Sequence, residues 1–185
     1  MRLFIAIVLA KDIRNKLADV QSALQKVQPD IKLVEPDNIH LTLRFLGEVA
    51  EDKLPEVARA ISAVENHPAF ELELKGLGAF PMAQQPKVVW VKGVDNSHTT
   101  EKVYNDLETA LIKAGFPPDD HKFSIHITLG RNKTPKYTNE FQGMMDKYCL
   151  ESFGKQAAQK VSLIRSTLTP AGPIYTNIRD FSLRK

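Results

Sequence analysis

Hydrophobic and polar residues follow regular patterns along the first half of the chain, and these patterns predict three strands and two helices. The apolar run over residues 2–9 predicts a first buried strand. Apolar residues spaced three and four apart predict amphipathic helices over 11–28 and near 53–66. Further strands are predicted at 39–49 and near 70–80, where apolar and charged residues alternate.

The second half of the chain repeats this order of elements. It predicts a strand at 87–92, a helix at 99–114, a strand at 123–129, a mixed segment at 136–148, and strands near 159–168 and 174–183. Gly115 is expected to end the helix, because glycine accepts the left-handed conformation found at helix C-termini.

An offset of 86 residues aligns the two halves. It pairs His40 with His126 and Thr42 with Thr128. It also pairs Phe4 with Trp90. The repeat is too long for a solenoid unit and predicts a duplicated α+β fold.

The expected architecture is bilobal, with two antiparallel sheets, helices on their outer faces and a central cleft between lobes related by a pseudo-twofold axis. Residues 1–185 are expected to form one domain, with repeat units at about 1–85 and 86–185.

Composition and charge narrow the class of protein. The chain is 43% hydrophobic and 25% charged, and no apolar run reaches the roughly 18 residues needed to span a bilayer. Cys149 is the only cysteine, which excludes an intrachain disulfide and fits a reducing, cytoplasmic location. The net charge is +3, and residues 152–185 carry six basic residues against one acidic residue. This basic end suits an anionic ligand or is simply a solvated face.

The repeated His-x-Thr pattern carries the candidate chemistry. Alternate residues of a strand point to the same face, so His40 and Thr42 are expected to share a face, as are His126 and Thr128. Polar residues that recur on one face of an apolar strand indicate that this face is in contact with water. With a twofold axis between the lobes, two imidazoles and two hydroxyls converge on one cleft.

Two histidines on opposite sides of a phosphate can cleave a phosphodiester without a metal. One takes a proton from the attacking water and the other gives a proton to the departing ribose oxygen, since the unperturbed pKa of histidine is about 6.5. The threonine hydroxyls can hold nonbridging oxygens while charge builds. A strained 2′,3′-cyclic phosphate is a favourable target because ring opening relieves strain.

Other residues near the pattern have two interpretations each. Arg131 either neutralises phosphate, which requires a bend near Gly130, or ends a solvated strand. Arg44, assigned to the polar face of its strand, either reaches the ligand or screens the rim. Phe4 and Trp90 are candidate base-stacking platforms, although core packing is the favoured interpretation.

The remaining histidines and motifs point to no cofactor. The three histidines outside the pattern are interpreted as surface residues: His67, His98 and His121. No phosphate-binding loop for ATP, dinucleotide fingerprint or set of zinc ligands is present in the sequence, so no cofactor and no metal site are expected.

Several segments together resemble the two-histidine phosphoesterase superfamily, in particular the RNA 2′,3′-cyclic phosphodiesterases first described as 2′–5′ RNA ligases. The similar segments, which extend over nearly the whole chain, are Arg2-Leu3-Phe4-Ile5-Ala6-Ile7, His40-Leu41-Thr42-Leu43-Arg44-Phe45-Leu46-Gly47-Glu48, Gly76-Leu77-Gly78-Ala79-Phe80-Pro81, Gly115-Phe116-Pro117, His126-Ile127-Thr128-Leu129-Gly130-Arg131 and Pro170-Ala171-Gly172-Pro173-Ile174-Tyr175.

The resemblance implies hydrolysis of a 2′,3′-cyclic phosphate to a 2′-phosphomonoester and a weak, ATP-independent, reversible 2′–5′ ligation of RNA. By position it implies that His40 acts as acid toward the leaving O3′ and His126 as base toward water. It also implies that Thr42, Thr128 and Arg131 bind phosphate. Ile125 and Gly130 replace residues that relatives usually have, which puts loop shape and substrate preference in question.

The expected substrates are RNA ends or small cyclic nucleotides. The chain is expected to act as a monomer, with no membrane association and no obligate protein partner. The rival hypothesis is a noncatalytic RNA- or nucleotide-binding module that has kept the cleft. A third hypothesis, ligation as the physiological reaction, uses the same residues as hydrolysis.

Overall fold

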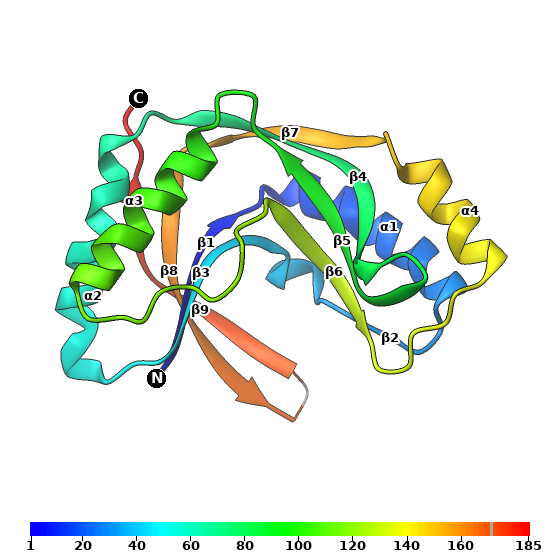
Figure 1. The fold of residues 1–185 in the computed structure, drawn as a ribbon, viewed down its shortest axis with the longest axis horizontal. Helices are drawn as coiled ribbons and strands as arrows, with labels where there is room; N and C mark the ends of the chain where they lie inside the picture. The colour runs from blue at the N-terminus through cyan, green and yellow to red at the C-terminus, as the bar shows by residue number, and fades with distance from the viewer. Residues whose placement is uncertain (171) are drawn as a thin grey trace.

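Antiparallel strands form two sheets in the computed structural model, which describes residues 1–170 and 172–185 (Figure 1). The first sheet has the order β3 (His40–Glu48), β1 (Arg2–Val8), β8 (Lys160–Thr169), β9 (Gly172–Ser182). The second has the order β2 (Ile31–Leu33), β6 (His126–Asn132), β5 (Gln85–Val94), β4 (Phe70–Met82), β7 (Ser152–Ala158).

Helices cover the two sheets in pairs. Figure 1 shows α2 (Leu54–Ile61) and α3 (Thr99–Lys113) together on the left, and α1 (Lys11–Val27) and α4 (Asn139–Tyr148) on the right. The contacts agree, since α3 packs on α2 and β3 whereas α1 packs on β6, β7 and α4. We call the first sheet with α2 and α3 the first lobe, and the second sheet with α1 and α4 the second lobe. This bilobal α+β arrangement confirms the predicted fold class.

The two lobes do not coincide with the two halves of the sequence. β4 comes from the first half yet lies between β5 and β7 in the second sheet, and β8 comes from the second half yet lies between β1 and β9. The helices that follow β1 and β5 are exchanged in the same way, since α1 covers the second sheet and α3 covers the first. With β2 and β9, which cross over in the same way, each half therefore contributes two strands and a helix to the other lobe.

One hydrophobic core extends through both lobes. It includes Ile5 and Leu41 from the first sheet and Val89 and Ile127 from the second, all of them fully buried. These residues point away from the histidine-bearing faces, as the alternation of apolar and polar positions predicts. No helix among the described residues has the length and apolarity to cross a membrane.

The predicted elements are largely confirmed, with differences at strand ends and edges. β6 begins at His126 rather than near residue 123, and the mixed segment at 136–148 forms α4. The helix expected near 53–66 is shorter, because α2 gives way after Ile61 to a 3₁₀ turn. The edge strands β2 and β7 were not predicted. Gly115 has a φ of 88° and follows α3, as expected.

Candidate active site

His40 is the first residue of β3, and its two ring nitrogens have different partners. Nδ1 lies 2.7 Å from the backbone oxygen of Asn38, and Nε2 lies 2.8 Å from Oγ1 of Thr42. A carbonyl oxygen only accepts hydrogen bonds, so Nδ1 carries the hydrogen in the neutral ring. Nε2 then accepts the hydrogen bond of the Thr42 hydroxyl and is the nitrogen that can exchange a proton.

Aromatic rings surround His40. Its centroid lies 4.8 Å from that of Phe4 and 5.5 Å from that of Tyr175, with the Tyr175 ring edge-on. Burial lowers the pKa of His40 below its usual value, and the hydrogen bond to the Asn38 carbonyl only partly offsets this effect. The neutral ring is therefore favoured in the free protein at neutral pH.

His126 begins β6 and is held in the same way. Its Nδ1 lies 2.9 Å from the backbone oxygen and 3.1 Å from Oγ of Ser124, which precedes it by two residues as Asn38 precedes His40. The carbonyl again fixes the hydrogen on Nδ1 and leaves Nε2 for proton exchange. The ring of Phe80 stands edge-on at 5.2 Å, and Trp90 lies at 6.2 Å.

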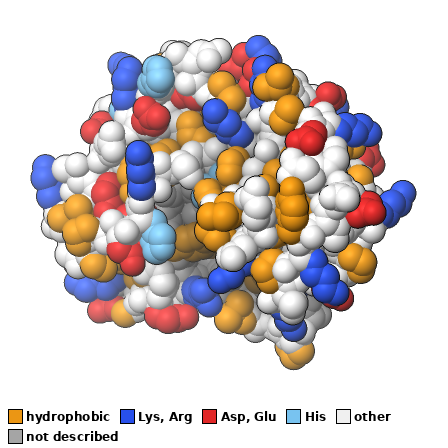
Figure 2. Space-filling model, turned by 45° about the vertical axis from the view of Figure 1, so that its right-hand side comes forward, with side chains coloured by type: hydrophobic (Ala, Val, Ile, Leu, Met, Phe, Trp, Pro, Cys, Tyr) orange, Lys and Arg blue, Asp and Glu red, His pale blue; other side chains and the backbone are white. Residues whose placement is uncertain are grey.

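The two histidine-bearing strands come from different sheets but pack against each other. Thr42 and Thr128 follow their histidines by two residues and are likewise half-buried, so each lies on the same face as its histidine. A hollow opens on one face of the molecule, edged by hydrophobic side chains and a histidine side chain (Figure 2).

A β-bulge in each strand decides where the next side chains point. In the pairing of β3 with β1, Leu43 and Leu46 are unpaired extra residues, and Leu129 is the counterpart of Leu43 in the pairing of β6 with β5. A bulge shifts the alternation of side chains by one residue. It turns Arg131 toward the face of His126, which provides the bend that the sequence required near Gly130.

The same shift corrects the prediction for Arg44, which leaves the polar face and turns toward α3. Its Nε donates to Glu108 Oε2 at 2.8 Å, and its Nη2 donates to the Pro117 carbonyl at 2.6 Å. Glu108 in turn accepts from the backbone N–H of Asp119. Arg44 thus anchors the irregular segment 116–125 that leads into β6, and Phe45, 58% exposed, takes its place on the face of His40.

Arg131 is exposed, and its positive charge affects the pKa of Tyr175 in the first lobe. Burial is the main cause that raises the pKa of Tyr175, while the positive charges of Arg131 and Arg2 oppose this rise. Tyr175 contacts His40, so Arg131 of the second lobe and His40 of the first both interact with this ring.

The two aromatic residues proposed for base stacking have different environments. Phe4 is only 2% exposed and packs in a small cluster with Ala6, Ile164 and Tyr175, so core packing is the correct interpretation for it. The strand pairing also corrects the alignment, because Trp90 lies opposite Thr128 where Ala6 lies opposite Thr42. Phe4 and Trp90 are therefore not equivalent in the two lobes.

Tyr175 and Phe80, the rings that stand edge-on to the two histidines, were not predicted as site residues. Both lie in segments that carry the resemblance to the two-histidine phosphoesterases. The sequence feature that could have indicated them is an aromatic residue close to glycine and proline in an apolar strand.

The other three histidines are not part of the site formed by His40 and His126. His67 pairs with Asp106 at 2.9 Å, and His98 adopts a left-handed conformation before α3. His121 contacts Asp120, and with Asp119 these residues form the group of potential metal ligands found in the described part of the chain. His121 interacts with Asp119 and Asp120 within the segment before β6, whereas Asp119 also accepts a hydrogen bond from Tyr104 of α3 and lies 3.8 Å from Nε of Arg44.

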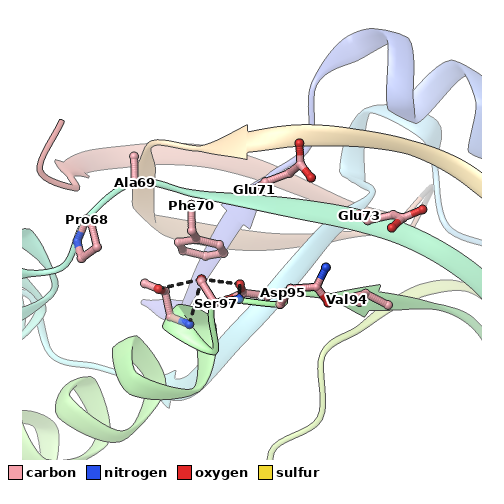
Figure 3. Close-up of a pocket in the computed structure, with 10 residues that line it drawn as sticks. Pro68, Ala69, Phe70, Glu71, Glu73, Val94, Asp95 and Ser97 are labelled. Atoms are coloured by element: carbon pink, nitrogen blue, oxygen red, sulfur yellow. Dashed lines mark hydrogen bonds between the residues drawn. The ribbon is translucent and has the colours of Figure 1, made fainter.

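A separate cavity of about 270 Å³ lies at the far end of β4 and contains none of the histidines (Figure 3). Asp95 faces this cavity. Its carboxylate already accepts hydrogen bonds from the N–H and hydroxyl groups of Ser97 and Thr100 at the start of α3. Glu71 and Glu73 give this region a negative charge, which is unfavourable for an anionic substrate.

A duplicated α+β fold that presents a His-x-Thr pair on each of two neighbouring strands defines a phosphoesterase of the two-histidine class. The chain belongs to the family described as LigT like Phosphoesterase, whose model matches residues 7–90 and 94–175.

Relatives and solved structures agree with this family over nearly the whole chain. A protein of Archaeoglobus fulgidus named RNA 2′,3′-cyclic phosphodiesterase is 39% identical over 181 residues, covering 98% of this chain and 99% of its own. One of Methanothermobacter thermautotrophicus with the same name is 34% identical, with 99% of each chain covered. A solved protein of Thermus thermophilus superposes with a TM-score of 0.82 at 31% identity, covering 100% of this chain and 98% of its own.

Proposed function

We propose that the protein hydrolyses 2′,3′-cyclic phosphates of RNA ends or nucleosides to 2′-phosphomonoesters, using His40 and His126 as an acid–base pair. The observation that supports this proposal is the matched setting of the two rings. Each donates Nδ1–H to the carbonyl two residues earlier and keeps Nε2 for proton exchange. The related proteins named RNA 2′,3′-cyclic phosphodiesterase supply the substrate class.

The proton path follows the assignment that the resemblance implies. His126 takes a proton from water as the water oxygen bonds to phosphorus, and His40 gives its Nε2 proton to O3′ as the P–O3′ bond breaks. Each such proton transfer contributes roughly 10²–10⁴ in rate. Thr42 donates to His40 Nε2 while the ring is neutral, so protonation of His40 frees this hydroxyl to bind a phosphate oxygen.

Thr128 and Arg131 complete the proposed phosphate site from the second lobe. The hydroxyl of Thr128 donates to a nonbridging oxygen, and the guanidinium of Arg131 stabilises the charge that builds on it. Both histidines belong to one chain, so a monomer of one bilobal domain suffices. The lone Cys149 fits a reducing compartment, and the cytoplasm is the proposed location.

The test is hydrolysis of nucleoside 2′,3′-cyclic phosphates, with the product identified as the 2′- or 3′-monophosphate. We expect His40→Ala and His126→Ala each to lose at least about 10²-fold in kcat with an unchanged circular dichroism spectrum. His121→Ala, which removes a histidine that is 85% exposed, is the matched control and should keep wild-type activity. Full activity in either active-site variant, or loss of activity with EDTA, would contradict the proposal.

A further inference from the structure

A second cavity, of about 140 Å³, lies directly beside His40 in the first lobe. Three of its lining residues are apolar or aromatic: Val8, Ile164 and Tyr175. Three more carry amides or a carboxylate: Asp37, Asn38 and Asn177. Sites that enclose a drug-sized ligand occupy roughly 300–1,000 Å³, so this cavity suits a single ring rather than a whole nucleotide.

The amide of Asn177 has a fixed orientation. Its Nδ2 donates to Asp180 Oδ1 at 2.8 Å. That carboxylate is ion-paired with Lys160 and also accepts from the buried hydroxyl of Ser162, so it acts only as an acceptor. The NH₂ group of Asn177 must therefore face Asp180. The carbonyl oxygen Oδ1 is therefore the acceptor that Asn177 can offer to a ligand in the cavity, next to the second N–H of the same amide.

Asn38, which precedes the edge strand β3, is also fixed by a hydrogen bond of its amide. Its Nδ2 donates to the backbone oxygen of Pro173 at 3.0 Å, which leaves its Oδ1 as an acceptor. The neighbouring Asp37 carboxylate is 96% exposed and also only accepts. The oriented amide oxygens of Asn38 and Asn177 and the carboxylate of Asp37 thus supply hydrogen-bond acceptors around the cavity, next to an aromatic and aliphatic surface.

We propose that this cavity is a nucleobase subsite that favours bases with an exocyclic amino group, which rests on the function proposed above. A planar base can pack on Tyr175 and Ile164 while its amino group donates to Asn177 Oδ1. Cytosine and uracil provide the simplest comparison, because cytosine carries an amino group at the ring position where uracil carries a carbonyl. A uracil carbonyl facing the Asn177 carbonyl leaves two acceptors unpaired.

The expected preference follows from one exposed hydrogen bond. Such a bond contributes about 0.5–1.5 kcal/mol, so kcat/KM for cytidine 2′,3′-cyclic phosphate should exceed that for the uridine compound roughly 2–12-fold. In Asn177→Leu, which removes the acceptor and keeps the side-chain size, this ratio should fall close to one. Asn105→Leu, on the exposed face of α3, is the matched control and should keep the wild-type ratio.

Binding of the products provides a readout that does not depend on turnover. Cytidine 2′-monophosphate should bind the wild type more tightly than uridine 2′-monophosphate by a similar factor, and should shift the side-chain NMR signal of Asn177. A wild-type ratio of one, or an unchanged ratio in Asn177→Leu, overturns the subsite. Tight, cytosine-selective binding without hydrolysis would instead support the subsite and overturn the proposed function.

Discussion

Arg44 connects the strand of one histidine to the segment that precedes the other, so its replacement tests how the site is held together. Arg44→Met keeps most of the aliphatic stem but removes the guanidinium. That group donates to Glu108, to the Phe45 carbonyl and to the Pro117 carbonyl at 2.6–2.8 Å. The Arg44 and Glu108 side chains are 10% and 15% exposed, so water replaces these bonds poorly.

The size of the effect follows from that burial. Hydrogen bonds to charged groups contribute about 1.5–3 kcal/mol, and removal of one partner of a buried ion pair costs about 3–5 kcal/mol. Glu108 keeps the N–H of Asp119 as a donor, which reduces the cost. We therefore expect Arg44→Met to lower the free energy of unfolding by about 2–4 kcal/mol, or Tm by roughly 4–16 °C.

Urea and thermal unfolding measure the loss, and a double-mutant cycle with Glu108→Gln assigns it. The coupling energy of the two sites should be about 1–3 kcal/mol. Lys53→Met is the matched control, because the Lys53–Glu56 pair is 54% and 44% exposed and its loss should leave the free energy of unfolding nearly unchanged. A loss below about 1 kcal/mol for Arg44→Met, or additive effects in the cycle, would refute the reasoning.

Two further predictions concern the surroundings of the histidines. Since burial lowers the pKa of His40 below 6.5 in the folded state, the unfolded chain binds this proton first. The free energy of unfolding should therefore decline as the pH falls from 6.5 to the folded-state pKa, and urea melts of His40→Gln should lack this part of the slope. In Gly78→Ala the new Cβ would lie 2.2 Å from the ring of Trp90, so we expect a loss of about 1–3 kcal/mol and a shifted fluorescence of this single tryptophan. Gly143→Ala, with no atom within 4 Å of its new Cβ, should not destabilise the protein, and an unshifted spectrum in Gly78→Ala would contradict the packing argument.

Local patterns predicted most of the elements because most of them bury one continuous face. The apolar stripe of α1 matches its buried residues Ile13, Leu17, Val20 and Leu24. β7 was not predicted because Ser152–Ala158 has few large apolar residues. This strand is held by its pairing with β4. The late start of β6 has a similar cause, since Arg44 donates to the Pro117 carbonyl and Glu108 accepts from the N–H of Asp119, which ties the preceding segment to β3 and α3.

The exchange of elements between the halves could not be predicted from the repeat. An offset of 86 residues shows that two segments are alike, but it contains no information on which sheet receives the third strand of each unit. The sheet that each third strand joins is decided by long-range contacts, namely the pairing of β8 with β1 and of β4 with β5. The exchange joins the halves through one core, so the spacing of the two histidines depends on the whole chain rather than on a hinge.

The bulges at Leu43 and Leu129 explain why the histidines could be predicted when their neighbours could not. The positions of His40, Thr42, His126 and Thr128 depend only on strict alternation, which holds up to the bulge. Just beyond it the next residues change face, so the guanidinium of Arg131 turns to the face of His126 in one lobe and the ring of Phe45 to the face of His40 in the other. The duplicated strands thus hold the two histidines in matched settings while the residues after the bulges differ, and under the proposed function this asymmetry suits a substrate with a phosphate at one end and a base at the other.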